Sequence, residues 1–117
     1  ITERKVCING DIKNNSTSSE GLSVSYGGLK INGNYTGSSN SSISIDITSA
    51  LEVAGIFDNG NGKINVTYGA KSIPASNVYI TKDIITAGLI QNVVSENINT
   101  APINNYFNFQ NIVITNN

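Results

Sequence analysis

Residues able to carry out catalysis are few in this chain. The sequence contains no histidine, the side chain that enzymes use most often as a general base and as a metal ligand. The lone cysteine, Cys7, follows Arg4 and Lys5, whose charges favour a thiolate, but no histidine can activate it. The carboxylates are scattered, and nothing in the spacing of Asp46 and Glu52 places them in one cleft as a glycosidase pair. The sequence therefore predicts a protein that is not an enzyme.

The loop Asp58-Asn59-Gly60-Asn61-Gly62 is the segment that comes closest to a metal site. Calcium needs oxygen ligands at alternate positions, and here those positions hold Asp, Gly and Gly, with no closing Glu. This pattern is more typical of a tight turn. The lack of histidine excludes zinc, and no glycine motif opens a helix that could bind phosphate. We predict neither a metal nor a cofactor.

Asn-x-Ser/Thr sequons are candidate glycosylation sites. A chain this rich in Asn, Ser and Thr contains several by chance, so their placement is more informative than their number. They fall in predicted loops or on the outward phase of predicted strands, which leaves all of them able to carry glycan in an exported protein. These sites are Asn14, Asn15, Asn34, Asn40 and Asn65.

Alternation of apolar and polar residues predicts strands along most of the chain. In Leu22–Tyr35 two alternating runs flank Gly27-Gly28, which predicts a hairpin with a two-residue turn and with Tyr26 on the inward face. In the same way, Leu51–Tyr68 predicts a hairpin around the loop 59–62. Further strands are predicted at Ile43–Ile47, Asn77–Thr81 and Tyr106–Thr115.

The segment 82–95 fits either a strand or a helix. We favour a strand, because the segment is β-branched and has Gly88 at its middle, but a short helical turn around 83–94 stays open. No internal repeat of useful period is visible. About seven to nine short strands separated by Gly, Asn and Ser turns predict an all-β fold, a single antiparallel β-sandwich of immunoglobulin-like or jelly-roll type.

The composition favours a protein outside the cell. Charged residues make up 13% of the chain, about half the share in an average soluble domain, and the net charge is −1. Such a surface does not suit nucleic acid, and no apolar run approaches the ~20 residues of a membrane span. The chain has no methionine, which indicates a processed chain or a fragment, as after removal of a signal peptide. We expect an extracellular or cell-surface location.

The N-terminal segment is the part that suggests a function. Val6, Ile8, Gly10 and Ile12 alternate with polar residues, and the polar stretch 14–21 follows them. The pattern resembles the donor strand of self-assembling pilus subunits, in which an extension completes a neighbour's sandwich by β-augmentation and a small residue fits a tight pocket. The resemblance implies an extension over residues 1–15, a sandwich domain over 16–117, and copies of the chain itself as partners. The segment fits equally well as the first strand of its own domain.

Two classes of function follow. The first is a structural subunit of a pilus or surface filament, with a virion protein as a variant. The second is an adhesin or carbohydrate-binding module of a larger surface protein, which would bind surface glycans. Sugar-binding platforms usually expose aromatic rings, and this chain has no tryptophan; Tyr79 and Tyr106 are the candidates for such a role.

Overall fold

The computed structural model describes residues 5–69, 83–104 and 114–115. The strands predicted at 77–81 and 106–115 lie outside the described residues or almost entirely so. The described residues form ten strands. In chain order they are β1 (Val6–Ile8), β2 (Ile12–Lys13), β3 (Leu22–Val24), β4 (Leu29–Ile31), β5 (Tyr35–Thr36), β6 (Ser42–Asp46), β7 (Leu51–Asp58), β8 (Lys63–Thr67), β9 (Ile85–Gln91) and β10 (Ile98–Asn99). Short 3-10 turns occupy Ser95–Asn97 and Ala101–Ile103.

Every strand pairing among the described residues is parallel. One sheet runs β1-β4-β7-β5-β2, with β9 on the other side of β7, and the second runs β10-β8-β6-β3. The antiparallel β-sandwich is therefore wrong, and so are both hairpins: β3 pairs with β6 instead of β4, and β7 does not pair with β8. The strand-forming segments were recognised, but their neighbours were not.

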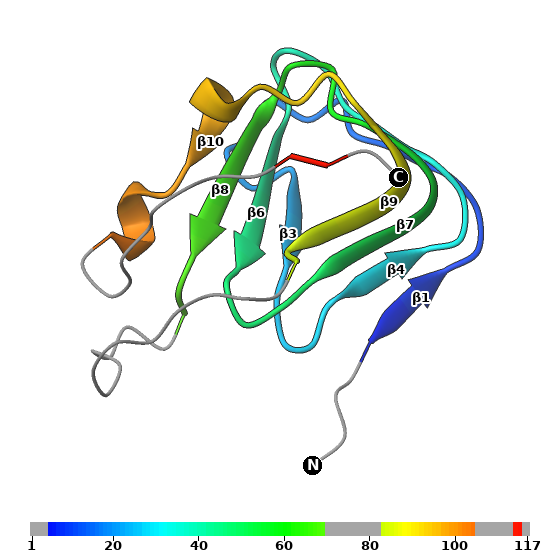
Figure 1. The fold of residues 1–117 in the computed structure, drawn as a ribbon, viewed down its shortest axis with the longest axis horizontal. Coiled ribbons are helices and arrows are strands. Elements are labelled where there is room, and N and C mark those ends of the chain that lie inside the picture. The colour runs from blue at the N-terminus through cyan, green and yellow to red at the C-terminus, as the bar shows by residue number, and fades with distance from the viewer. Residues whose placement is uncertain (1–4, 70–82, 105–113, 116–117) are drawn as a thin grey trace.

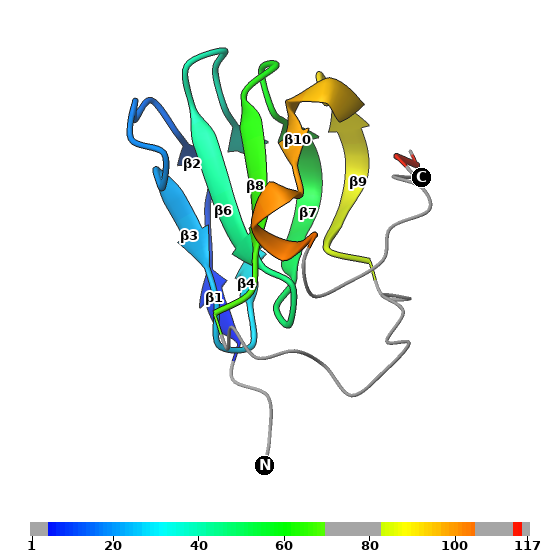
Figure 2. The same cartoon turned by 90° about the vertical axis from the view of Figure 1, so that its left-hand side faces the viewer.

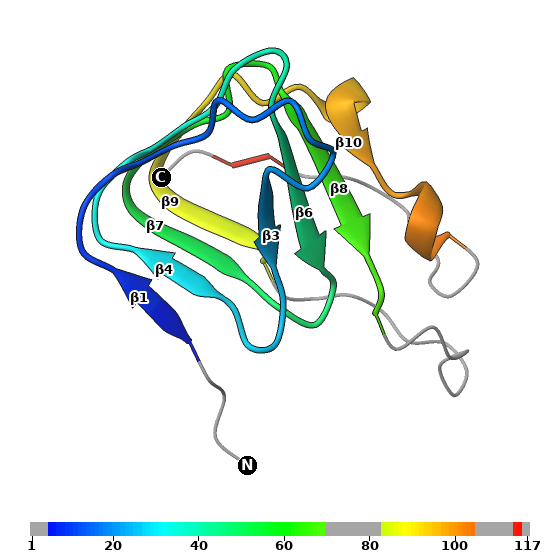
Figure 3. The same cartoon turned by 180° about the vertical axis from the view of Figure 1, so that it is seen from behind.

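The chain winds as a parallel β-solenoid, in which each turn of the chain lies on the one before. We call these turns coils: coil 1 holds β1–β3, coil 2 β4–β6, coil 3 β7 and β8, and coil 4 β9 and β10. Figure 1 looks along the stack, and Figure 2 shows β3, β6, β8 and β10 side by side in that order. Seen from behind, β1, β4, β7 and β9 line the opposite side (Figure 3).

The coils repeat at a nearly constant length. Val6 pairs with Leu29 and Leu29 with Leu51, so the steps are 23 (29−6) and 22 (51−29) residues. The next step, from Leu51 to Ile85, is 34 residues (85−51) and includes 70–82, which lie outside the described residues. The chain thus has an internal repeat that we did not expect. A sequence signal for it exists: Ile-Asn-Gly-Asx occurs at 8–11 and again at 31–34, one coil apart.

Apolar side chains of like position stack between coils and form the core. Leu22, Ile43, Ile64 and Ile98 occupy one such column, with Ile43 fully buried at its middle. In another column the rings of Tyr35 and Phe57 stack with their centroids 5.0 Å apart and their planes at 16°. Both rings are fully buried, and such a pair contributes about 0.5–1.5 kcal/mol beyond the area that it buries. Tyr35 lies on the inward face, as the alternation within Leu22–Tyr35 predicts, because alternation does not depend on the direction of the neighbouring strand.

A column of glycines lets the first sheet bend. Gly10, Gly33 and Gly55 occupy matching positions in coils 1 to 3, and Gly88 follows in coil 4 beside a register shift between Val53 and Ile56. A Cβ on Gly33 would collide with the carbonyl oxygen of Gly10, and one on Gly55 would lie 2.9 Å from that of Gly33. Only glycine allows the coils to approach this closely at the bend.

The region left open between strand and helix, 82–95, contains β9 and is a strand from Ile85 to Gln91. The polar stretch 14–21 is the loop that connects β2 to β3. It lies against the outer side of the second sheet, where the Asn65 side-chain amide donates to the carbonyl of Ser19 at 3.4 Å. Ser42 and Ser44, which point outward from β6, are buried. Asn14 at the start of the stretch is buried, whereas residues 15–21 are all exposed. The domain boundary after residue 15 stays a prediction, and β1 and β2 both pair with strands of coil 2.

Candidate functional site: the open edge of the first coil

The first coil has one side without a neighbour in the described structure. β1 and β2 end the two branches of the first sheet, and β3 ends the second sheet. We call the side of these three strands that faces away from coil 2 the open edge. Such an edge offers unpaired backbone N–H and C=O groups to another strand.

In β1 and β2, the backbone groups that face the open edge belong to Cys7 and Lys13. The Val6 N–H donates to the Gly28 carbonyl at 3.2 Å, and the Ile8 carbonyl accepts the Asn32 N–H at 2.8 Å, so both residues face coil 2. Successive residues of a strand present these groups to opposite sides, so those of Cys7 point away from coil 2. By the same alternation, the bonds that Ile12 and Asn14 donate to coil 2 turn Lys13 toward the open edge.

The predicted donor-strand residues lie along this edge. Val6 is 62% exposed, while Ile8 and Ile12 are half-buried and pack against the core. Gly10 is the last glycine of its column, and a Cβ on it would have no atom within 4 Å. The segment pairs with β4 and β5 of its own chain, which is the second of the two alternatives left open by the sequence.

Beside the glycine column, the side chains of Asp11 and Asn34 link successive coils, starting at this edge; we call them the Asx ladder. Asp11 Oδ1 accepts the backbone N–H of Asn34, and Asn34 Oδ1 accepts that of Ile56, each at 2.8 Å. Beside this ladder, Asn32 Nδ2 donates to Asn9 Oδ1 at 2.8 Å. These side chains satisfy N–H groups where the bend interrupts the backbone pairing. The ladder ends in coil 3, where Ile56 replaces Asx.

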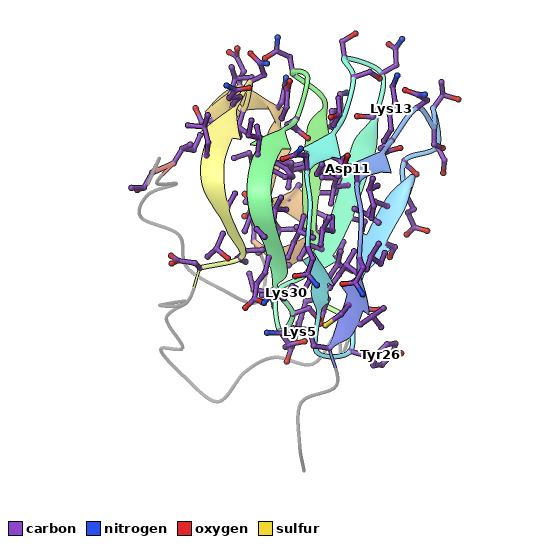
Figure 4. The ribbon with its side chains drawn as sticks, turned by 90° about the vertical axis from the view of Figure 1, so that its right-hand side faces the viewer. Lys5, Asp11, Lys13, Tyr26 and Lys30 are labelled. Atoms are coloured by element: carbon purple, nitrogen blue, oxygen red, sulfur yellow. The ribbon has the colours of Figure 1, made fainter. Side chains whose placement is uncertain are left out.

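Charged side chains flank the edge without forming a concentrated field. Figure 4 shows Lys5, Asp11 and Lys13 spread along coil 1, with Lys30 on the next coil. Lys5 Nζ lies 3.0 Å from Glu52 Oε1, with both side chains about one-third exposed. A pair this exposed contributes little stability.

A buried polar corner lies where β2 and β5 end. Asn14 is 5% exposed, and its Nδ2 donates to Tyr35 Oη at 3.0 Å and to the Ser42 carbonyl at 3.1 Å. Burial raises the pKa of Tyr35 above its ordinary value of 10.0, although hydrogen bonds from Asn14 and Ser41 oppose the rise. In coil 3, Asn59 is also buried, and its Nδ2 donates to the Gly62 backbone carbonyl. The hydrogen bonds of Asn14 thus join the corner of coil 1 to coil 2.

The sequons differ in accessibility. The side-chain nitrogen of Asn14, the atom that would carry a sugar, is buried and bonded, so the folded chain does not present it. Asn65 Nδ2 also donates a bond, to Ser19. Asn15, Asn34 and Asn40 are exposed. Glycosylation stays a prediction, and these three exposed asparagines are the sites where we expect it.

The predicted inward orientation of Tyr26 is wrong, because its side chain faces solvent. It begins the corner Tyr26-Gly27-Gly28, in which all three residues have positive φ (54°, 107° and 118°), and it is 92% exposed. A hairpin would have turned its ring onto the core face, whereas the corner turns it to solvent. Tyr79 and Tyr106, the other ring candidates, lie outside the described residues.

The part of the chain described by the structure contains no group of three or more His, Cys, Asp or Glu side chains able to hold a metal ion. Asp58, from the loop considered for calcium, instead accepts bonds at Oδ1 from the Gly60 N–H and from Asn92 Nδ2. Asp46 and Glu52, the two carboxylates considered for glycoside hydrolysis, engage different partners: Asp46 accepts from Thr48 and Gly69, and Glu52 pairs with Lys5. Cys7 is exposed. No helix among the described residues is long and apolar enough to cross a membrane.

Comparisons with protein-family models, with curated proteins and with solved structures found no match to this chain.

Proposed function

We propose that this protein is a non-enzymatic structural component of an extracellular assembly, a β-solenoid module that joins copies of itself by strand addition at the open edge of coil 1. The observation that carries the proposal is the direction of the backbone groups of Cys7 and Lys13, which face away from coil 2. An edge of this kind binds through main-chain hydrogen bonds. The N-terminal segment acts as an edge that stays folded on its own subunit.

Two further properties support this role. Val6 is exposed at the edge, and Ile8 and Ile12 are only half-buried, so a strand added there would cover apolar surface. The low charge of the chain limits repulsion between copies. Lysines at positions 5 and 13 are the kind of residue that discourages indiscriminate pairing of an edge. Together these features favour association with a specific partner strand.

The test uses two neighbouring proline substitutions in the full chain. Cys7→Pro removes an N–H that faces the open edge, and edge strands tolerate proline when the lost N–H faces solvent. Val6→Pro removes the N–H that bonds Gly28 within the subunit. We expect the parent chain to form larger species as its concentration rises, as measured by sedimentation and negative-stain microscopy. Cys7→Pro should abolish these species without changing the monomer's fold.

Val6→Pro is the matched control. It should lower the free energy of unfolding by about 1 kcal/mol, the contribution of one hydrogen bond, while assembly persists. A parent chain that stays monomeric at every concentration would contradict the proposal. So would unchanged assembly of Cys7→Pro.

A binding module remains the second candidate, favoured by one observation. Tyr26 presents an almost fully exposed ring on a corner of three positive-φ residues, and backbone strain of this kind often accompanies function. A glycan array with the full chain and with Tyr26→Ala tests this role. Binding that is lost in Tyr26→Ala but kept in Lys30→Ala would favour the module over the structural role.

A further inference from the structure

We infer that Asn9-Gly10 is a site of spontaneous covalent modification, at which the Asn9 side chain closes on the Gly10 backbone nitrogen to form a succinimide. Hydrolysis would then convert the residue to aspartate or isoaspartate. The inference rests on the geometry of one dipeptide and is independent of whether copies assemble. It distinguishes one Asn-Gly pair from the others in the chain, at Asn32, Asn59 and Asn61.

The reaction is an intramolecular acyl transfer that needs only water. The Gly10 nitrogen attacks Cγ of Asn9, the bond from Cγ to Nδ2 breaks, and Nδ2 leaves as ammonia with the proton lost by the Gly10 N–H. Water then opens the five-membered imide at either carbonyl. One product is aspartate; the other is isoaspartate, in which the backbone runs through the side-chain carbonyl and gains one carbon.

At Asn9-Gly10 each participating group is available. Both residues are exposed, and the Gly10 N–H donates no hydrogen bond within the described structure. A Cβ on Gly10 would have no atom within 4 Å, so no neighbouring group crowds that side of the residue. The side-chain oxygen Oδ1 of Asn9 accepts a bond from Asn32 Nδ2 at 2.8 Å, which polarises Cγ for attack and leaves the departing nitrogen of Asn9 in solvent.

Asn32-Gly33 lacks two of these conditions. The leaving nitrogen of Asn32 is the donor of the bond to Asn9. Gly33 is wedged against the carbonyl of Gly10, so its backbone has little room to move. Asn32-Gly33 in coil 2 lies between coil 1 and coil 3, whereas Asn9-Gly10 in coil 1 has a neighbouring coil on one side only among the described residues.

The two pairs in the corner of coil 3 are blocked at the nucleophile. The Gly60 N–H donates to Asp58 Oδ1 at 3.0 Å, and Asn59 itself is 1% exposed. The Gly62 N–H donates to the Asn59 carbonyl at 2.9 Å. A backbone nitrogen that already donates a hydrogen bond, in a peptide plane that the turn holds in place, cannot approach the side-chain Cγ of the preceding Asn.

Modification would change the open edge. Either product places a new carboxylate beside Asp11 on coil 1, and isoaspartate lengthens the backbone at the bend. The new carboxylate can still accept the bond from Asn32, so the fold of the remaining coils is expected to persist.

The test follows the full chain in mildly alkaline buffer by proteolysis and mass spectrometry, with an isoaspartate-specific methyltransferase label. We expect the peptide containing Asn9 to convert several-fold faster than those containing the other three sites. Asn9→Gln should abolish the early conversion, since glutamine closes the larger ring slowly. In denaturant all four sites should convert at similar rates.

Three results would overturn the inference. The first is another Asn-Gly pair that converts as fast as Asn9 in the folded chain. The second is a folded chain that shows no conversion at Asn9 while the unfolded chain converts. The third is a preference for Asn9 that persists unchanged in denaturant, because selectivity would then come from local sequence and not from the fold.

Discussion

Asp11 and Asn34 occupy the same position in successive coils, and the Asp11 side chain accepts the backbone N–H of Asn34 at 2.8 Å. Asn34 repeats the contact one coil higher with Ile56. A side chain therefore links each coil to the next where the bend interrupts the strand ladder. The two links have the spacing of the repeat, because they join residues that are 23 (34−11) and 22 (56−34) positions apart.

Loss of one Asx link should weaken the stack. We expect Asn34→Ala to lower the free energy of unfolding by about 0.5–1.5 kcal/mol, because the Ile56 N–H loses its acceptor. Asn34→Asp keeps an oxygen acceptor and should restore most of the loss. Urea denaturation measures both.

Asn40→Ala serves as the control for this prediction. Asn40 is exposed in the loop before β6, and its replacement should change stability by less than about 0.5 kcal/mol. An Asn34→Ala variant as stable as the parent chain would show that solvent replaces the link without cost.

The glycine column predicts a steric requirement at the bend. Gly33→Ala places a Cβ against the carbonyl oxygen of Gly10, and the coils can separate only by disturbing their pairing. We expect a loss of about 1–3 kcal/mol of stability, the range typical of overpacked sites, seen as a lower midpoint of thermal unfolding.

Gly69→Ala is the matched substitution, because a Cβ there would have Asp46 Oδ1 as its nearest atom, at 3.8 Å. It should leave the midpoint almost unchanged. Equal effects of the two substitutions would indicate a general cost of removing glycine and no steric contact in the column.

The Tyr35 hydroxyl predicts a dependence of stability on alkaline pH. Burial raises the pKa of Tyr35 above 10.0, so the folded chain keeps this proton at a pH where the unfolded chain has begun to lose it. The unfolded state then binds fewer protons, and the free energy of unfolding falls as pH rises through and above 10. Below that range the group is protonated in both states and contributes no slope.

Tyr35→Phe isolates this effect. The variant should lose about 1 kcal/mol at neutral pH, because Asn14 Nδ2 loses one of its two acceptors. Its stability should fall less steeply than that of the parent above pH 10. Parallel curves for the two proteins, measured by urea denaturation across pH, would assign the slope to other groups.

Alternation was the part of the fold that the sequence could reveal. The alternating runs in the sequence place Ile31, Ile43, Phe57 and Ile64 on one face of their strands, and all four are buried. A period of two depends only on the strand itself. The identity of the neighbouring strand does not follow from alternation. Gly27-Gly28 can close a hairpin or turn a solenoid corner, and both use positive φ angles.

The repeat could have settled that ambiguity. Ile-Asn-Gly-Asx at 8–11 and 31–34 marks the bend in coils 1 and 2, but coil 3 has Ile56 in place of the Asx, and coil 4 begins 34 residues after coil 3. Two copies of a short motif are weak evidence of a period. The donor-strand interpretation of Gly10 as the small residue for a tight pocket follows from the same missing repeat. Its place in the glycine column becomes apparent only when the coils are aligned.

Amide exchange can test the direction of the backbone groups at the open edge. The amides of Cys7 and Lys13 should exchange rapidly in the monomer, whereas those of Ile12 and Asn14, which donate to coil 2 at 2.9 and 2.8 Å, should be protected. The contrast between Lys13 and its two neighbours is the internal control, because all three share one local stability. At concentrations where copies associate, the Cys7 amide should become protected while the protection of Asn14 stays the same. Protection of Cys7 that is already complete in the dilute monomer would mean that this edge is covered within a single chain, and the proposed strand addition would then have no place to occur.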